Sequence, residues 1–432
     1  MSRNTDFIPF SRPSLGPEEE AAVLRVMRSG WLTTGSEAEA FEAEFARAMG
    51  KRNALAVSSA TAGLHLALEA AGVGGGDLVA MSPYTFAATA EVVRYLGAYP
   101  LFVDIEEQGF NIDPEKLDAA VSGGARAGGP PVGPVRAESG AGRVRAVVPV
   151  HVAGEPCRMN RIGEIAAEHG LSVVSDAAHT LVTTDGTPVG AEGDAAVFSL
   201  YATKPITTGE GGMVTTDRDD LAARMRVMRL HGIDRDVWDR YTSAQAGWSY
   251  AVVEAGYKYN MADLCAAIGR VQLKKAGRLH ARRRAIAEHY RERLGRLPFL
   301  ELPPEHPLHC YHLFIVQLLE SELSIGRDEF IEELRSENVG GSVHFIPLHV
   351  MPYYRNLYGY TEESFPVSWK RFRRSVSLPL YPDLSDAQVE RVAEAVERPG
   401  SRHRAKRNVS GTGSSHGTVV RHRHGPSGPA SL

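Results

Sequence analysis

Short apolar runs alternate with helical patterns over the first two thirds of the chain. The runs are ALAV (54–57), DLVAMS (77–82), YPLFVDI (99–105), VRAVVPVHV (144–152), LSVVSDAA (171–178) and DAAVFSL (194–200). Helical stretches such as ATAGLHLALEAAG (60–72) and Met159–His169 lie between some of them. Short apolar strands that alternate with helices predict an α/β domain with a mostly parallel sheet.

The pattern changes near Leu264, where a long helical stretch begins (AAIGRVQLKKAGRLHARRRAIAEHYRERL, 266–294) and a mixed segment follows. We therefore expect a large domain over residues 1–263, including an N-terminal segment, and a smaller C-terminal α/β domain over 264–399. Residues 400–432 are rich in Ser, Gly, His and Arg and lack apolar periodicity, which predicts a disordered basic tail. The Gly- and Pro-rich stretch 122–143 is predicted to be an inserted surface loop.

Composition narrows the class of protein. The chain has 432 residues, 43% hydrophobic and 23% charged, as in soluble enzymes. No apolar run approaches the roughly 20 residues of a membrane span, and the N-terminus lacks the apolar stretch of a secretory signal. Three widely spaced cysteines predict neither disulfides nor a metal site and fit a cytoplasmic protein. The basic residues of the tail leave the rest of the chain acidic, which argues against nucleic acid as a partner.

Candidate chemistry lies where the predicted strands end, since ligands of parallel sheets bind at the carboxyl ends of strands. Lys204 follows the run DAAVFSL, Asp176 and His179 follow LSVVS, and ALAV is followed by a Ser-capped helix that starts near Ala60 and Thr61. Each feature alone has an ordinary explanation, because serine and aspartate cap helices and a lysine can be a solvated loop residue.

Together these features suit pyridoxal 5'-phosphate (PLP). The phosphate requires backbone N–H groups such as those of Ala60 and Thr61, the ring nitrogen requires a carboxylate, and the aldehyde requires an amine such as that of Lys204. Phe86, in SPYTFAAT, could lie flat against the ring, although simple core packing would also explain it.

At this point the chain resembles the DegT/StrS-type sugar-nucleotide aminotransferases, which are PLP-dependent transferases of fold type I. The motifs that carry the resemblance are VSSATAGLHLAL, SPYTFAAT, VPVHVAG, SDAAHT, FSLYATKPITTGEGGMV, GYKYNMADLCAAIGRVQL and VHFIPLHVMPYY. Within the family, SSATAG, DAAH and GYKYNM are most similar to members that aminate a UDP-4-keto-pentose to UDP-4-amino-4-deoxy-L-arabinose.

The resemblance implies a role for each matching residue. Lys204 corresponds to the Schiff-base lysine, and Asp176 corresponds to the partner of the pyridine nitrogen. The other matches are His179 beside the ring and its 3-hydroxyl, Ser199 with Ala60 and Thr61 at the phosphate, Phe86 as the stacking aromatic, and His344 and Phe345 in the sugar-nucleotide pocket. By sequence alone, His344 and Phe345 could equally belong to an ordinary strand.

The resemblance also implies the reaction and the assembly. We expect an aminotransferase of amino-sugar biosynthesis that takes a keto-sugar nucleotide as substrate and L-glutamate as donor. Family members are homodimers with shared active sites, and the candidates for residues lent to the partner are the loop around Tyr241–Trp248 and Lys258, the latter at the cofactor.

Two residues depart from the family pattern: Ser175 stands where glutamate is usual, and Pro205 follows the lysine where asparagine is common. We expect neither to abolish PLP binding. Three alternatives stay open, namely an aminotransferase for a keto-carbocycle (a keto-inositol or an aminobenzoate precursor), a PLP-dependent sugar dehydratase, and a non-catalytic regulator with this fold. Lys204 argues against the dehydratase, which has histidine there, and the intact Lys204, Asp176 and Ser199 argue against the regulator.

Overall fold

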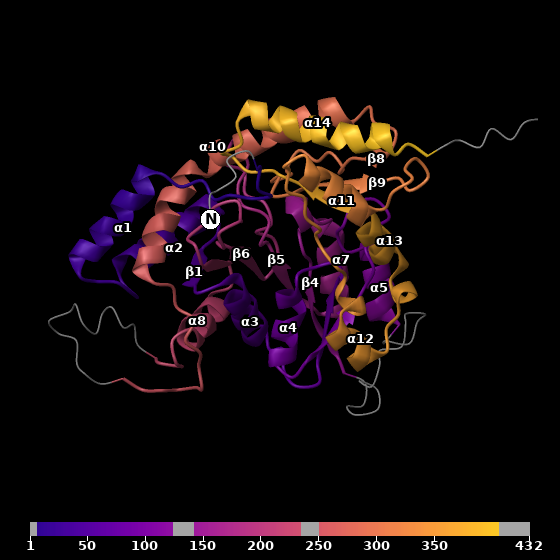
Figure 1. Cartoon of the computed structure of the whole chain (residues 1–432). Helices are drawn as coiled ribbons and strands as arrows, with labels where there is room; N and C mark the ends of the chain where they lie inside the picture. The colour runs from indigo at the N-terminus through magenta and orange to yellow at the C-terminus, as the bar shows by residue number, and fades with distance from the viewer. Residues whose placement is uncertain (1–6, 124–141, 235–249, 406–432) are drawn as a thin grey trace, which may run out of the picture.

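The computed structural model describes residues 7–123, 142–234 and 250–405. Within these ranges seven strands form one sheet in the order β1-β7-β6-β5-β4-β2-β3, with helices packed around it (Figure 1). The strands are β1 (Asn53–Val57), β2 (Leu78–Met81), β3 (Tyr99–Phe102), β4 (Val144–Val148), β5 (Ser172–Asp176), β6 (Ala195–Ser199) and β7 (Gly212–Thr216). The predicted α/β class is therefore confirmed.

The sheet is mostly parallel, and β7 is the strand that runs against its neighbours. It pairs antiparallel with both β6 and β1, whereas the other neighbouring strands pair parallel. The apolar runs in the sequence correspond to β1 through β6, but β7 was not predicted as a strand. Its sequence, GMVTT, directly follows a Gly-rich turn and has few apolar residues, so its hydrophobic signal is weak.

Helices cover both faces of the sheet, as the alternation of strand side chains shows. In β6, Ala195 and Val197 belong to a core shared with α3, α4, α7 and α8, whereas Ala196 and Phe198 belong to a core shared with α2 and α10. The helices are α1 (Pro17–Ser29), α2 (Ser36–Ala48), α3 (Ala60–Ala70), α4 (Ala87–Tyr95), α5 (Pro114–Ser122), α7 (Met159–His169), α8 (Asp219–Met228), α10 (Asp263–Leu294), α11 (Arg327–Ser336), α12 (Pro352–Tyr358), α13 (Pro366–Arg374) and α14 (Asp386–Arg402).

A second core forms the C-terminal unit around an antiparallel sheet of order β10-β9-β8. Its strands are β8 (Leu300–Glu301), β9 (Phe314–Leu318) and β10 (Ser375–Leu378). The 32-residue helix α10 joins both units, because its first part packs in the core of the large sheet and its last part in the second core. Ile8 also lies in the second core and pairs with Val339, so the chain around Ile8 packs with the C-terminal unit.

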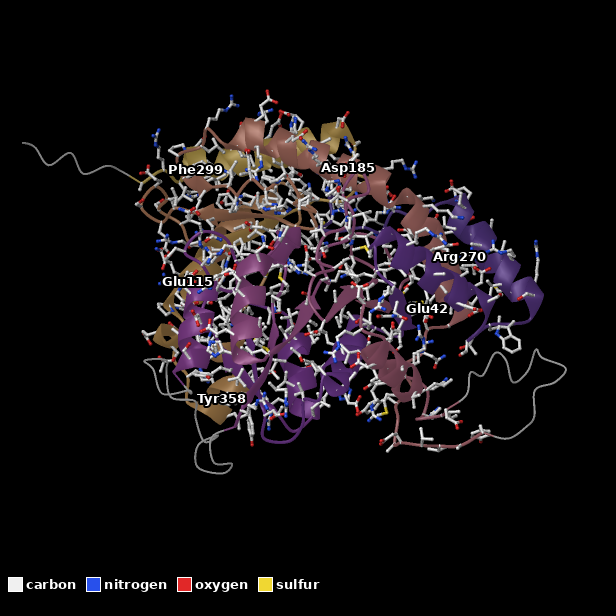
Figure 2. All side chains as sticks on the ribbon, turned by 180° about the vertical axis from the view of Figure 1, so that it is seen from behind. Glu42, Glu115, Asp185, Arg270, Phe299 and Tyr358 are labelled. Carbon is white, nitrogen blue, oxygen red and sulfur yellow. The ribbon has the colours of Figure 1, made fainter. Side chains whose placement is uncertain are left out.

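The C-terminal helix is longer than the sequence suggested. A tail beginning at residue 400 was expected from its composition, but α14 continues through Pro399 and Gly400 to Arg402. Gly400 allows this, since a Cβ atom there would lie 1.9 Å from the ring of Phe299. Figure 2 shows Phe299 in the C-terminal unit, at the opposite end of the molecule from Tyr358 of α12. Residues 406–432 lie outside the described ranges, as do residues 124–141 of the predicted inserted loop.

No helix of the described residues is both long and apolar enough to cross a membrane.

Candidate active site

A cavity of about 480 Å³ opens where the strands of the large sheet end and the C-terminal unit meets them. Nine of the ten candidate residues from the sequence line it: Ala60, Thr61, Phe86, Asp176, His179, Ser199, Lys204, His344 and Phe345. The tenth, Lys258, does not line it. Lys258 is exposed, and its Nζ donates to Asn260 Oδ1 at 2.6 Å. The loop Tyr241–Trp248 lies outside the described residues.

The start of α3 forms one wall of the cavity. Ser59 caps the helix, and its Oγ accepts a hydrogen bond from the Ala62 N–H at 3.1 Å. The first N–H groups of a helix have no partner within the helix, so those of Ala60 and Thr61 are suited to an anion. Ser199 lies beside this wall, because it pairs in register with Gly212 of β7.

Gly212 lets β7 pass directly beneath that wall. A Cβ atom at Gly212 would lie 2.6 Å from the Ala60 nitrogen, and one at Gly63 would lie 2.7 Å from the Val197 side chain. The two glycines therefore allow the start of α3 to pack tightly against the ends of β6 and β7. This packing sets Ser199 close to the helix start.

Asp176 ends β5 and is buried, with 6% of its surface exposed. Its Oδ2 accepts a hydrogen bond from Thr89 Oγ1 at 2.8 Å, and its Oδ1 accepts one from the Ala178 N–H at 3.1 Å. Burial raises the pKa of the Asp176 carboxyl, and these two hydrogen bonds and the charge of Lys204 oppose that rise. A cation brought next to this carboxylate would favour its ionised form.

His179 is buried and neutral. Burial lowers the pKa of its imidazole well below the usual value, and the nearby Lys204 lowers it further. Its Nδ1 accepts a hydrogen bond from the Ala153 N–H at 3.1 Å, so the neutral ring carries its proton on Nε2. Its ring stacks on that of Phe345, with centroids 5.8 Å apart and planes 17° apart.

Lys204 follows β6 and lines the cavity. Burial lowers the pKa of its amine to about 8, although the Asp176 carboxylate raises it in part. A substantial fraction of the amine is therefore neutral near pH 8, which is the form that attacks a carbonyl carbon.

Apolar rings complete the cavity. Phe86 is 65% exposed, which is unusual for a phenylalanine at the start of a packed helix, and its ring centroid lies 6.4 Å from that of Phe345. His344 stacks on Phe10 with centroids 5.1 Å apart, and its Nδ1 lies 2.9 Å from Ser377 Oγ. A flat group could therefore rest against the exposed face of Phe86.

Sequence reasoning missed several residues of the cavity. Thr89 lies one helical turn after Phe86 in the same motif, and that spacing could have indicated it. His312 and Phe10 come from the C-terminal unit and the N-terminal segment, and no local pattern connects them to the strand ends. The His312 ring lies 4.3 Å from that of His179. Ser175, which stands where the family pattern has glutamate, does not line the cavity. Its Oγ donates to the Glu192 carbonyl at 2.8 Å.

A second, wider cavity of about 780 Å³ adjoins the first and shares Thr85, Phe86 and Phe345 with it. Its other walls come from α4 and from the start of α12, and they include Arg94, Tyr95, Tyr353 and Tyr354. The Arg94 guanidinium donates from Nη1 to the Ala98 carbonyl and lies over the ring of Tyr99, whereas the ring of Tyr353 is exposed. This wall therefore presents an aromatic face to a ligand.

No group of three or more His, Cys, Asp or Glu side chains in the described part of the chain could hold a metal ion.

Comparison with known proteins agrees with this geometry. A model of the DegT/DnrJ/EryC1/StrS aminotransferase family matches residues 13–397. The spore coat polysaccharide biosynthesis protein SpsC of Bacillus subtilis is 44% identical over 400 residues, which cover 92% of this chain and 98% of SpsC.

Solved structures are similar over the same range. Spr1654 of Streptococcus pneumoniae, solved in its PLP form, superposes with a TM-score of 0.79 at 27% identity, covering 92% of this chain and 99% of that one. DesI, solved in the presence of its TDP-sugar product, gives a TM-score of 0.76 at 32% identity, covering 92% and 94%.

Proposed function

Because this chain belongs to the DegT/DnrJ/EryC1/StrS aminotransferase family and is a PLP-dependent sugar aminotransferase, we propose that it moves an amino group from L-glutamate to the keto group of a sugar nucleotide. The observation that carries the proposal is the juxtaposition of a partly buried amine, whose pKa is lowered to about 8, with a buried carboxylate in one cavity, Lys204 with Asp176.

The residues of the cavity fit PLP. The unpaired N–H groups at the start of α3, with the Ser199 hydroxyl, suit its phosphate, and the exposed face of Phe86 suits its ring. Asp176 suits the protonated ring nitrogen, because that cation would offset the cost of burying the carboxylate. When bound, PLP supplies a reactive aldehyde and a ring that withdraws electrons from the carbon next to the amine.

Lys204 has two tasks in this proposal. Its Nζ would hold the cofactor at rest. When the donor amine has displaced it, the freed Nζ would be the base that takes the proton from the donor Cα and the acid that delivers it to the cofactor carbon attached to the donor nitrogen. A general base works best when its pKa lies near the working pH, and burial brings the pKa of Lys204 to about 8.

The imidazole of His179 donates from Nε2, since its Nδ1 is occupied by the Ala153 N–H. This matches the role that the resemblance assigns to it beside the ring hydroxyl. A neutral imidazole can hold that oxygen without adding a charge to the cavity.

The second cavity supports a nucleotide-linked substrate. A free sugar needs only the room next to Lys204, whereas a nucleotide extends well beyond it. The adjoining cavity offers the exposed ring of Tyr353 and shares Phe86 and Phe345 with the first cavity. An aromatic face is what a stacked base requires.

The active unit in this proposal is a homodimer in which Lys258 of one subunit completes the site of the other. Its exposed position outside the cavity of its own chain is compatible with that role. A cytoplasmic location suits the three free thiols, Cys157, Cys265 and Cys310.

The test uses the PLP-loaded protein in two steps. L-Glutamate alone should release one equivalent of 2-oxoglutarate and shift the visible absorbance of the bound cofactor. The protein converted in this way is then offered 4-keto sugar nucleotides with uridine or thymidine, and keto-inositols in parallel. Amination of the sugar nucleotide is expected. Turnover of the carbocycle alone, or release of water in place of transfer, would contradict the proposal, and Lys204→Ala provides the inactive control.

A further inference from the structure

A buried arginine holds the turn that follows Lys204. Arg283 lies on α10 with 5% of its surface exposed, and its Nη1 donates to the Pro205 carbonyl oxygen at 3.0 Å. Its Nε is buried without a hydrogen-bond partner, and within the described ranges the guanidinium forms no ion pair with a carboxylate. Burial lowers the pKa of Arg283 to about 10. An unpaired buried charge costs stability, so stability alone does not explain it.

Two other residues on the same face of α10, Gly269 and Gln272, also contact the turn that follows Lys204. Gln272 Oε1 accepts from the Thr207 N–H at 3.4 Å. A Cβ atom at Gly269 would lie 2.9 Å from the Thr208 methyl group, so the helix and the turn touch there as well. Residues 269, 272 and 283 lie on one side of a helix, because their spacings of three and eleven residues are close to whole numbers of turns.

The chemistry of Pro205 makes the arginine contact specific. Proline has no N–H, so its carbonyl is the only polar backbone group of that residue, and it is buried directly after Lys204. A buried carbonyl without a partner would be unfavourable. Arg283 donates this hydrogen bond from α10, the helix that also packs in the core of the C-terminal unit.

We propose that Arg283 is a positioning residue that fixes the Pro205–Ile206 peptide, directly after Lys204, to α10 and thereby holds the Lys204 amine in its desolvated place in the cavity. The inference rests on the proposed function, in which Lys204 binds the cofactor. It adds that the place of the amine is set by a side chain that lines neither cavity.

The pKa of the Lys204 amine shows how far the amine is shielded from water, and therefore whether it keeps its position in the cavity. The titratable groups whose pKa values respond to its charge are Asp176, His179, His312 and His344. Burial lowers the pKa values of all three histidines, so they are neutral near pH 7, and Asp176 raises the pKa of the amine. Burial is therefore what lowers the pKa of Lys204 to about 8. If the turn moves and the amine becomes hydrated, its pKa should rise toward the ordinary lysine value of about 10.4.

The experiment measures the pKa of Lys204 in cofactor-free protein from the pH dependence of its acetylation, followed by mass spectrometry of the peptide that contains it. Arg283→Met keeps an unbranched side chain in place of the arginine stem and removes the donors. Arg283→Lys restores one donor and the charge. Arg284→Met, on an exposed arginine paired with Glu288, is the matched control. We expect Arg283→Met to raise the midpoint by about one pH unit or more, Arg283→Lys to restore it in part, and the control to leave it unchanged.

An unchanged midpoint in folded Arg283→Met protein would overturn the inference. If that variant does not fold, Arg283→Gln, which is neutral and too short to reach Pro205, should show the same rise, and no rise would again overturn it. The readout needs no cofactor. A wild-type protein whose Lys204 does not bind PLP would therefore contradict the proposed function without affecting this measurement.

Discussion

Replacing Thr89 by valine tests how the buried carboxylate of Asp176 stays ionised. Thr89 Oγ1 donates its single proton to Asp176 Oδ2 at 2.8 Å, so the Thr85 hydroxyl, 2.8 Å away on the other side, must donate to Thr89. Burial raises the pKa of Asp176, and the hydrogen bond from Thr89 is the foremost of the effects that oppose this rise. Valine has nearly the same shape as threonine and cannot donate.

The size of the effect follows from the contact. A hydrogen bond to a charged group contributes about 1.5–3 kcal/mol, and one pKa unit corresponds to about 1.36 kcal/mol. Thr89→Val should therefore raise the pKa of Asp176 by about one to two units. Because this pKa is already above its unfolded value, the carboxyl favours the folded state below the unfolded pKa and loses that contribution as pH rises through the folded pKa. Cofactor-free Thr89→Val should thus lose more stability near neutral pH than in acid.

The assay is the affinity for PLP, measured by absorbance titration as a function of pH. In the proposed site the ring nitrogen would pair with the ionised carboxylate, so the affinity should fall on the acid side of the Asp176 pKa by about tenfold per unit. The acid limb should move up by about one to two units in Thr89→Val and stay in place in Thr89→Ser, which keeps the hydroxyl. An acid limb that is the same in both variants and in the wild type would refute the reasoning.

Three further substitutions test other parts of the site. Phe86→Ala should weaken PLP binding by about three- to tenfold, because an aromatic stacking contact contributes about 0.5–1.5 kcal/mol; an unchanged dissociation constant would contradict its place against the ring. Tyr353→Ala should raise the KM for the sugar nucleotide by about tenfold and leave the glutamate half-reaction unchanged, since Tyr353 lines only the second cavity; equal effects on both half-reactions would exclude the nucleotide from that cavity. Gly212→Ala should reduce PLP affinity by more than about tenfold, because its Cβ would press on the Ala60 nitrogen at 2.6 Å; wild-type affinity would show that the start of α3 does not bind the phosphate.

The sequence indicated much of the fold because its strands are short and apolar. Three of the predicted apolar runs became the strands that end at Val57, Asp176 and Ser199, and the carboxyl ends of these strands meet at the cavity. β7 was missed because five residues with two threonines and a glycine give a weak apolar signal. The last residues of α14 were also missed, because the composition of residues 400–432 predicted a disordered tail, whereas the packing of Gly400 on Phe299 lets the helix continue to Arg402.

The candidate site was accessible from sequence where its residues follow strands directly. Asp176, Lys204 and the start of α3 belong to that group, and their motifs are local. Phe10 and His312 line the cavity, and Arg283 contacts the turn after Lys204, only because the C-terminal unit and α10 pack onto the large sheet. No spacing in the chain therefore connects these residues to the site. Thr89 lies between these two groups. Its spacing of one helical turn from Phe86 indicates that it is near the site, but only once the cavity is known.

Chemical identification of the lysine that binds PLP tests the proposed site most directly. The PLP-loaded protein is reduced with borohydride, which fixes the cofactor to its lysine, and the labelled peptide is sequenced by mass spectrometry. Label on Lys204 alone, and none on Lys204→Ala protein, is the predicted result. Label on another lysine, such as Lys258, or a wild-type protein that takes no label while binding PLP, would contradict the assignment of Lys204.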